Sequence, residues 1–225
     1  MGKASKAVNF NAKWDITNNL LYGLMPKMTG EQKEYAHKLL NEDIVFCDSK
    51  AGTGKTTIAI AIAKLLKEHG RIDRLVYIFS PVQENAMGHF PGDKEKYDRY
   101  LDPLYDALIE VGEDPMKAMS DRFGWVEARP HSFLRGCNLQ SAFVLVDEAQ
   151  NFTKDELKRT ISRIHSESGS KAAVIGHTGQ IDLKNAKESA FASCIDHFRG
   201  MDRCGIATLT ERNFRGWISE HVDMW

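Results

Sequence analysis

The clearest chemical pattern in this chain is the segment 49–57, which reads Ser-Lys-Ala-Gly-Thr-Gly-Lys-Thr-Thr. It follows a short apolar run and opens an amphipathic stretch, which is the usual context of a phosphate-binding loop between a strand and a helix. Gly52 and Gly54 let backbone N–H groups approach phosphate oxygens closely, because they carry no Cβ. Lys55 can reach the β- and γ-phosphates of ATP as a point charge, and the Thr56 hydroxyl can bind Mg²⁺. The segment therefore predicts a P-loop.

The positions expected to contact the nucleotide lie in this loop and in the first turn of the helix after it. They are Ser49, Lys50, Ala51, Gly52, Thr53, Gly54, Lys55, Thr56 and Thr57. The usual pattern has glycine where this chain has Ser49, so we expect an altered first turn of the loop and weaker nucleotide binding. A glycine-rich start of a helix without a ligand is the alternative. The order of strand, glycines, lysine and threonine favours the P-loop over it.

A pair of carboxylates follows the apolar run 143–146. Asp147 and Glu148 would lie at the C-terminal end of a strand, where α/β sheets bind their ligands. We expect Asp147 to hold Mg²⁺, directly or through water, and Glu148 to polarise the attacking water. An acidic pair after a strand is by itself more often a helix N-cap. Together with a P-loop, the pair predicts a Walker B site.

A further polar loop, 177–182, follows the apolar run 172–175 and contains Gln180. The amide of Gln180 can reach the γ-phosphate and is the candidate sensor, whereas a turn-forming or capping role is the alternative. Arg212 and Arg215 are either solvated surface charges or include an arginine finger. Phosphoryl transfer gains from a cation placed at the γ-phosphate, which is the reason to consider them.

These motifs need a scaffold, and the pattern of apolar residues supplies one. Short apolar runs alternate with longer stretches that carry apolar residues three and four apart, which is typical of βα units in a parallel sheet. We predict five strands, at 44–47, 75–79, 143–146, 172–175 and 206–209, and helices at 55–69, 94–110, 154–165 and 187–198. A capped helix is expected after Thr29, with Glu31 near its positive end, and a polar loop at 112–123. The predicted fold class is α/β, with a single P-loop NTPase core.

Composition and charge limit the alternatives. The 225 residues fit one domain, and 30 basic against 31 acidic residues leave a net charge of -1, so no global field attracts nucleic acid or a membrane. The four cysteines show no zinc-ligand spacing, and the first residues show no secretory signal. The most apolar window, 58–66, is too short to span a bilayer. We expect a soluble cytoplasmic protein with no membrane contact.

Taken together, these segments resemble the PhoH-like ATPases, which are similar to the first core domain of superfamily 1 helicases. The resemblance runs from about Thr29 to the C-terminus. Besides the P-loop it rests on Gln32, Phe90-Pro91-Gly92-Asp93, Leu101-Asp102-Pro103-Leu104-Tyr105-Asp106-Ala107-Leu108, Phe133-Leu134-Arg135-Gly136, Asp147-Glu148-Ala149-Gln150 and Gln180-Ile181-Asp182-Leu183. It implies a RecA-like parallel sheet flanked by helices, with 29–225 as the PhoH-like ATPase domain. Residues 1–28 have mixed polarity and weak periodicity, so we expect an N-terminal arm or irregular lead-in there.

The resemblance also implies roles for single residues. By this resemblance Gln32 contacts the adenine, and Lys55 and Thr56 bind the phosphates and the metal ion. Asp147 and Glu148 carry out hydrolysis, and Gln180 senses the γ-phosphate. Arg215 lies near the active site. It implies ring-like self-association, for example as a hexamer, with RNA or single-stranded DNA as the polymer. His177 stands where the family has Asp, a departure that bears on the sensing loop. We expect the ATPase module alone, without the RNA-binding or nuclease domains of some members, a form that would suit a phage-infected bacterial cell.

Three functions remain open at this point. An ATPase coupled to RNA or single-stranded DNA needs a neighbouring subunit to supply the second face that helicases have. A phosphotransferase is the second, because a P-loop does not choose between water and an alcohol, although Glu148 favours water. A nucleotide-dependent binding or scaffold protein with little turnover is the third.

Contact with nucleic acid rests on the weakest pattern. The modest basic cluster Lys154, Lys158, Arg159 and Arg163 fits either phosphate contact or a solvated helical face. The aromatic residues Phe90, Tyr97 and Tyr100 fit base stacking, the core or a subunit interface.

Overall fold

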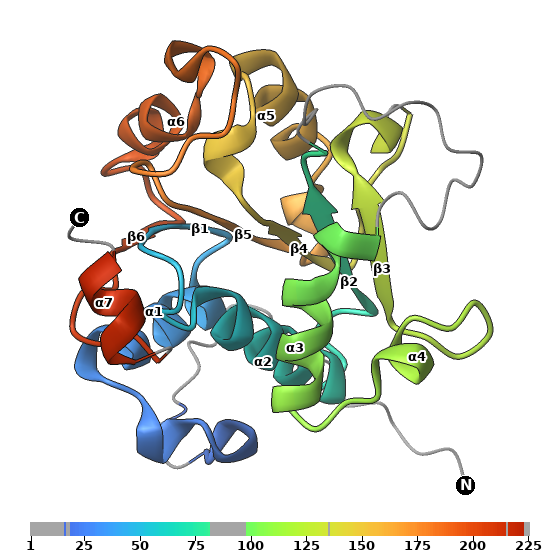
Figure 1. Cartoon of the computed structure of the whole chain (residues 1–225). Helices are drawn as coiled ribbons and strands as arrows, with labels where there is room; N and C mark the ends of the chain where they lie inside the picture. Colours follow the sequence, from blue (N-terminus) through green and yellow to red (C-terminus); the bar gives the residue numbers. More distant parts are fainter. Residues whose placement is uncertain (1–15, 17–18, 82–97, 135, 215, 223–225) are drawn as a thin grey trace, which may run out of the picture.

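A computed structural model describes residues 16, 19–81, 98–134, 136–214 and 216–222 of this chain (Figure 1). Six parallel strands form one sheet in the order β3-β2-β4-β5-β1-β6. The strands are β1 Ile44–Asp48, β2 Arg74–Phe79, β3 Val126–Pro130, β4 Ala142–Val146, β5 Lys171–Gly176 and β6 Cys204–Ala207. The predicted parallel α/β core is confirmed.

Helices cover both faces of the sheet (Figure 1). They are α1 Gly30–Asn41, α2 Lys55–Glu68, α3 Asp102–Glu110, α4 Pro115–Ala118, α5 Lys154–Ile161, α6 Phe191–Phe198 and α7 Trp217–Val222. Short 3₁₀ turns lie at Leu21–Gly23, Met25–Lys27, Asp98–Tyr100, His131–Leu134, Ala149–Asn151, Ser166–Ser168 and Ala186–Glu188. Helices α1, α2 and α3 share one buried cluster with strand residues such as Val45 and Leu145, and α5 and α6 share the other with Phe46 and Val146. Successive residues of a strand point to opposite faces of the sheet, so the strands contribute side chains to both clusters.

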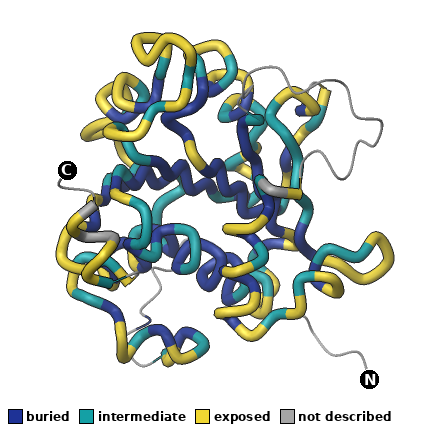
Figure 2. Tube along the Cα trace, viewed as in Figure 1, coloured by how far each residue is buried: buried dark blue, intermediate teal, exposed yellow. Residues whose placement is uncertain are grey.

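The strand order brings the three predicted motifs together. Strand β5 lies between β1 and β4, so the loops that follow these three strands leave one edge of the sheet side by side. They carry the P-loop, the segment 177–182, and the pair Asp147 and Glu148. All five residues of β4 are buried, as are the middle residues of β1 and β5 (Figure 2). The three loops therefore follow directly from buried strands in the centre of the sheet.

Helix α1 begins where the sequence predicts, after Thr29. The Gln32 backbone N–H donates to Thr29 Oγ1 at 3.3 Å, and the Thr29 N–H donates to Gln32 Oε1 at 2.9 Å. This reciprocal pair is a capping box, which satisfies two N–H groups that a helix N-terminus otherwise leaves without a partner.

Several predicted boundaries are wrong. The sheet has six strands and not five, because β3 is an edge strand whose residues after Val126 are only partly buried and include Glu127 and Arg129, so it has no apolar run. The last strand is Cys204–Ala207 and not 206–209, since the Leu209 N–H donates to Ser49 Oγ instead of to a neighbouring strand.

The helix boundaries differ in a similar way. The helix predicted at 154–165 ends at Ile161, and the one predicted at 187–198 begins only at Phe191, after a 3₁₀ turn. The loop predicted at 112–123 contains the short helix α4, capped by the Asp114 side chain. Of the helix predicted at 94–110, positions 94–97 lie outside the described residues and the rest forms a 3₁₀ turn and α3.

Before Thr29 the described part of the chain packs against the core. Ile16, Leu21, Leu24 and Met28 are buried in the cluster that includes α1 and α2. Across the described residues, none of the helices is long and apolar enough to cross a membrane.

Candidate functional site

The P-loop turns from β1 into α2 through two glycines with left-handed backbone. Gly52 has φ 78° and Gly54 has φ 82°, values that residues with a Cβ rarely adopt. Gly54 is the N-cap of α2, a helix of 14 residues that starts at Lys55. The free N–H groups and the positive end of the helix dipole therefore lie at this turn, which suits an anion such as phosphate.

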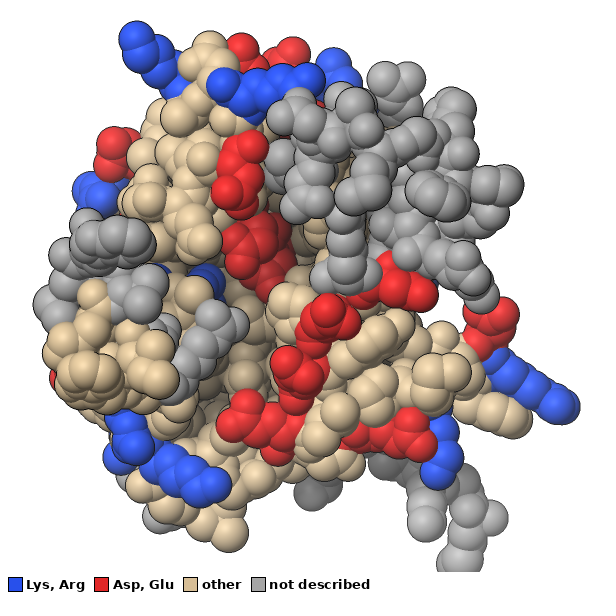
Figure 3. Space-filling model, viewed as in Figure 1, with Lys and Arg blue, Asp and Glu red and all other residues tan. Residues whose placement is uncertain are grey.

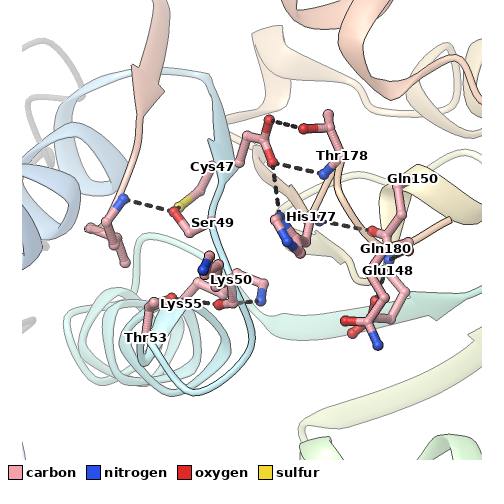
Figure 4. Close-up of polar contacts among 12 residues, drawn as sticks. Cys47, Ser49, Lys50, Thr53, Lys55, Glu148, Gln150, His177, Thr178 and Gln180 are labelled. Carbon is pink, nitrogen blue, oxygen red and sulfur yellow. Dashed lines mark hydrogen bonds and ion pairs between the residues drawn. The ribbon is translucent and has the colours of Figure 1, made fainter. Parts of the chain in front are cut away.

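Lys55 is buried within this loop although it carries an ammonium group. Its Nζ donates to the Lys50 carbonyl oxygen at 3.2 Å, and Thr53 Oγ1 donates to the same oxygen at 3.0 Å (Figure 4). The Lys50 side chain itself is exposed. A buried cation next to the N–H groups of a helix N-terminus suits an anionic oxygen such as that of a phosphate.

Ser49, the departure from the usual P-loop pattern, has a structural role. It is buried, its Oγ accepts the Leu209 N–H at 2.7 Å, and its own N–H donates to the Gly176 carbonyl at 2.9 Å. Ser49 is not among the described non-glycine residues with positive φ. Glycine is therefore not required here by the backbone, and the hydroxyl connects the P-loop to the segment after β6.

Asp147 lies buried at the end of β4 and faces α2. Its Oδ2 accepts the Tyr77 hydroxyl at 2.9 Å and the Thr56 hydroxyl at 3.3 Å, and its Oδ1 accepts the Glu148 N–H at 2.9 Å. Burial and the negative charge of Glu148 raise the pKa of Asp147 to about 6, although Lys55 opposes the shift.

The meeting of Thr56 and Asp147 fits Mg²⁺, which prefers hard oxygen ligands. In the part of the chain that the structure describes, no three His, Cys, Asp or Glu side chains are grouped to hold a metal by themselves. This also fits Mg²⁺, because the ion usually takes one or two protein oxygens and completes its shell with phosphate oxygens and water.

Glu148 has a left-handed backbone with φ 51° and ψ 43°, and its side chain is exposed towards the site. Non-glycine residues rarely adopt this conformation, and when they do it is often at functional positions. Its carboxylate accepts a hydrogen bond of 2.6 Å from Gln150 Nε2.

These groups line a cavity of about 530 Å³. The P-loop and the start of α2 contribute Ala51, Gly52, Gly54, Lys55, Thr56 and Thr57, and the acidic part of the lining consists of Asp147, Glu148, and Asp106 and Glu110 of α3. Acidic side chains gather in and beside the central hollow of this face (Figure 3). Apolar lining comes from Leu24, Met28, Ile58 and Phe214. The cavity therefore offers a cation and helix N–H groups for phosphates, and apolar surface for a base.

Not every residue predicted to contact the nucleotide lines this cavity. Ser49, Lys50 and Thr53 line a neighbouring cavity of about 700 Å³ on the other side of the P-loop. Thr57 lines the first cavity, but its hydroxyl donates to Glu110 Oε2 at 3.1 Å. Gln180 is exposed and belongs to neither lining, and Arg215 lies outside the described residues.

Gln32 lines the first cavity, and both ends of its amide are engaged. Besides accepting the Thr29 N–H, it donates from Nε2 to the Thr53 carbonyl at 2.8 Å. Gln32 therefore joins the start of α1 to the P-loop, a contact that the sequence did not predict.

A segment after β6, residues 208–214, covers the P-loop from the outside. Asn213 Nδ2 donates to the Ala51 carbonyl at 3.2 Å, and the Phe214 N–H donates to the Gly52 carbonyl at 2.8 Å. The Glu31 carboxylate accepts from Thr210 and Glu211, and these bonds lower the pKa of Glu31. We call this segment the C-terminal strap. It pairs residues more than 150 positions apart, for which the sequence carries no local signal.

Arg212, which the sequence offers as an alternative to Arg215, is exposed on the strap. Its guanidinium carbon lies 4.8 Å from the centre of the Phe214 ring.

The candidate nucleic-acid residues are only partly described. Lys154, Lys158 and Arg159 are exposed on α5, whereas Arg163 is half-buried. Tyr100 stacks on Phe79 with ring centres 5.5 Å apart and packs against the core. Phe90 and Tyr97 lie outside the described residues.

Comparison with known proteins agrees with this geometry. A family model described as "PhoH-like protein" matches residues 25–222. The PhoH-like protein of Bacillus subtilis (strain 168) is 34% identical over 216 residues, which cover 94% of this chain and 67% of that protein. The PhoH-like protein of Mycobacterium tuberculosis (strain ATCC 25618 / H37Rv) is 35% identical over 215 residues, which cover 94% of this chain and 60% of that protein. The chain thus spans about half to two thirds of the length of the relatives it matches.

Among solved structures, the large terminase of a thermophilic bacteriophage in complex with ADP is similar, with a TM-score of 0.56. The sequence identity is 11%, and the match covers 87% of this chain and 49% of the terminase. At this identity the likeness concerns the fold alone.

Proposed function

This chain belongs to the PhoH-like protein family, and from that premise we propose that it binds ATP with Mg²⁺ in the cavity around Lys55 and hydrolyses the γ-phosphate. The observation that carries the proposal is the meeting of Thr56 and Asp147, 3.3 Å apart, beside the buried ammonium of Lys55. A carboxylate from one strand, a hydroxyl and a cation from a helix N-terminus are the groups that a Mg–triphosphate complex needs.

In this proposal each group acts on a stated part of the substrate. Lys55 exchanges its bond to the Lys50 carbonyl for the β- and γ-phosphates, while the N–H groups at the start of α2 bind phosphate oxygens. Thr56 and Asp147 would hold Mg²⁺, which would supply positive charge to neutralise the phosphate oxygens. Glu148, exposed towards the site, orients and deprotonates the attacking water. Gln180 senses the γ-phosphate, and Arg215 supplies a cation near it.

The base of the nucleotide would lie on the apolar side of the cavity. Leu24, Met28 and Phe214 are available there, with Gln32 at the boundary to the P-loop. The ADP complex of the similarly folded terminase supports a nucleotide in this kind of core.

We further propose that turnover is coupled to RNA or single-stranded DNA in a ring-like homo-oligomer, such as a hexamer. A single core has one of the two faces that helicases use, so a neighbouring copy would supply the other, including an Arg in trans. The exposed cations of α5 are available for phosphate contact. The four cysteines are free thiols, which suits a reducing cytoplasm.

The test is phosphate release from Mg-ATP by the purified protein, with and without single-stranded RNA and DNA, across a salt series. We expect turnover that Lys55→Ala reduces by about a hundredfold or more. Stimulation by a polymer that fades with salt supports the coupling. Formation of ADP and a phosphate ester only when an alcohol acceptor is added, without release of inorganic phosphate, supports a phosphotransferase instead. Nucleotide binding without formation of ADP supports a nucleotide-dependent scaffold.

A further inference from the structure

We propose that Gln150 is a positioning residue that couples the Glu148 carboxylate to the loop 177–182, so that the conformation of this loop sets the orientation of the carboxylate that activates water. The inference rests on the proposed ATPase function. Gln150 lies two residues after Glu148 in the sequence, and the mechanism proposed above gives it no part.

Gln150 is fully buried, and its amide makes three hydrogen bonds, one at the oxygen and two from the nitrogen. Oε1 accepts the His177 N–H at 3.0 Å, while Nε2 donates to Glu148 Oε2 at 2.6 Å and to the Gln180 carbonyl at 3.0 Å (Figure 4). A backbone N–H can only donate, and a carboxylate and a carbonyl accept, so these partners fix which end of the amide is oxygen. The amide cannot flip without losing all three bonds.

The end of β5 leaves room for this amide. A Cβ on Gly176 would lie 2.5 Å from Gln150 Oε1 and 3.1 Å from the Gln150 backbone nitrogen. Any other residue at this position would displace Gln150. The glycine is therefore explained by the close approach of the amide, and not by a positive φ.

The Glu148 carboxylate is held by this contact at its Oε2. The residue is exposed and sits in the left-handed region, where the fold must hold it. The same nitrogen that holds the carboxylate also holds the Gln180 carbonyl. Any ligand that moves the loop, such as a γ-phosphate at Gln180, therefore changes the hydrogen bond at Glu148, and by linkage the reverse also holds.

The next residue provides a matched comparison. Asn151 is also buried, its Nδ2 donates to Asp182 Oδ2 at 3.1 Å, and its Oδ1 accepts the Asp182 N–H at 2.8 Å. It connects the same two segments as Gln150 without these bonds reaching Glu148. If Gln150 only holds the two segments together, substitution of Gln150 and of Asn151 should affect kcat equally. If Gln150 also positions Glu148, its substitution should lower kcat more.

The experiment compares Gln150→Ala, Gln150→Met and Asn151→Ala with the wild type. It measures kcat and KM for Mg-ATP, the affinity for a non-hydrolysable ATP analogue and thermal unfolding. Gln150→Met keeps the length of the side chain and adds no charge, but it cannot donate to Glu148, so it tests the contact without leaving a large cavity. We expect both Gln150 variants to lower kcat about 10- to 100-fold, with KM and analogue affinity within about threefold of wild type. Asn151→Ala loosens the same loop at Asp182 but leaves the bond from Gln150 to Glu148 in place, so it should lose stability and lower kcat less than about fivefold.

Each outcome decides the inference. A kcat near that of wild type in Gln150→Met overturns it, and so does an equal loss of kcat in Asn151→Ala, which would show that the loop connection is merely structural. Absence of turnover by the wild type itself overturns the ATPase proposal, and this inference with it.

Discussion

Asp147 is the residue at which stability and the proposed function oppose each other. Its pKa in the folded state is raised to about 6, above the ordinary 3.8, so the folded state holds the proton more tightly than the unfolded chain. The contribution to stability is thus full below about pH 4 and is lost as the pH rises through 6. At neutral pH the buried carboxylate therefore lowers the free energy of unfolding, because the folded state has to give up a proton that it holds more tightly than the unfolded chain does.

We therefore expect Asp147→Asn to raise the free energy of unfolding by about 1–3 kcal/mol at about pH 7.5 without nucleotide. Asn can still bond to Tyr77 and to the Glu148 N–H, while the buried charge is removed. The gain should shrink towards about pH 4, where Asp147 is neutral in both states. Urea unfolding at the two pH values measures this, and a variant less stable than wild type at the higher pH would contradict it. Mg²⁺-dependent turnover should be lost.

Ser49 offers a second test at the scale of one side chain. Ser49→Ala leaves the buried Leu209 N–H without its acceptor, and we expect a loss of about 1–3 kcal/mol in the free energy of unfolding. Ser162→Ala is the matched control, because the Ser162 hydroxyl donates to an exposed carbonyl that water can satisfy. The control should stay within about 0.5 kcal/mol of wild type. Equal effects of the two substitutions in urea unfolding would rule out the proposed link between P-loop and strap.

Secondary-structure elements were predictable where one local property defines them. Strands β1, β4 and β5 are continuous apolar runs because both faces of the sheet are covered, and the predicted bounds differ from the observed ones by at most one residue at each end. The edge strand β3 was missed because its partly buried residues have no such run. Helix α1 was predicted from its cap, which is a local pattern.

The residues of the candidate site also fall into two groups, those that the sequence predicts and those that it does not. Lys55, Thr56 and Asp147 were predictable because they follow strands at fixed spacings. Gln150 and the C-terminal strap were not, because their contacts depend on the order of the strands and on residues far apart in the chain. Spacing along the sequence identifies the candidate groups for phosphate and metal, whereas the arrangement of the strands decides which side chains hold them in place.

Helix α1 provides the test at the scale of elements. Gln32→Ala removes the bonds to the Thr29 N–H and to the Thr53 carbonyl, whereas Thr29→Ala removes only the cap to the Gln32 N–H. We expect the free energy of unfolding of the nucleotide-free protein to fall by about 2–3 kcal/mol in the first variant and by about 1 kcal/mol in the second. Thermal unfolding without nucleotide measures this. Unchanged stability of Gln32→Ala would show that Gln32 does not brace the P-loop.

For the whole molecule, the charge around the cavity determines which form of the nucleotide can bind. Asp106, Glu110, Asp147 and Glu148 line the cavity, against Lys55 and Lys27. Free ATP carries several negative charges and would meet like charges here, so we expect binding only as the Mg²⁺ complex. The metal and the nucleotide should therefore stabilise the protein together and not separately.

Ligand-induced stabilisation tests this directly. At about 100 times the dissociation constant, a ligand that binds only the folded state adds about 2.7 kcal/mol. For a domain of this size, each kcal/mol raises Tm by about 2–4 °C, so Mg-ATP should raise Tm by about 5–10 °C. We expect no such rise when EDTA removes Mg²⁺, nor in Lys55→Ala. An equal rise with ATP and EDTA would show that the acidic lining does not impose a need for the metal, and would separate nucleotide binding from the Thr56–Asp147 pair.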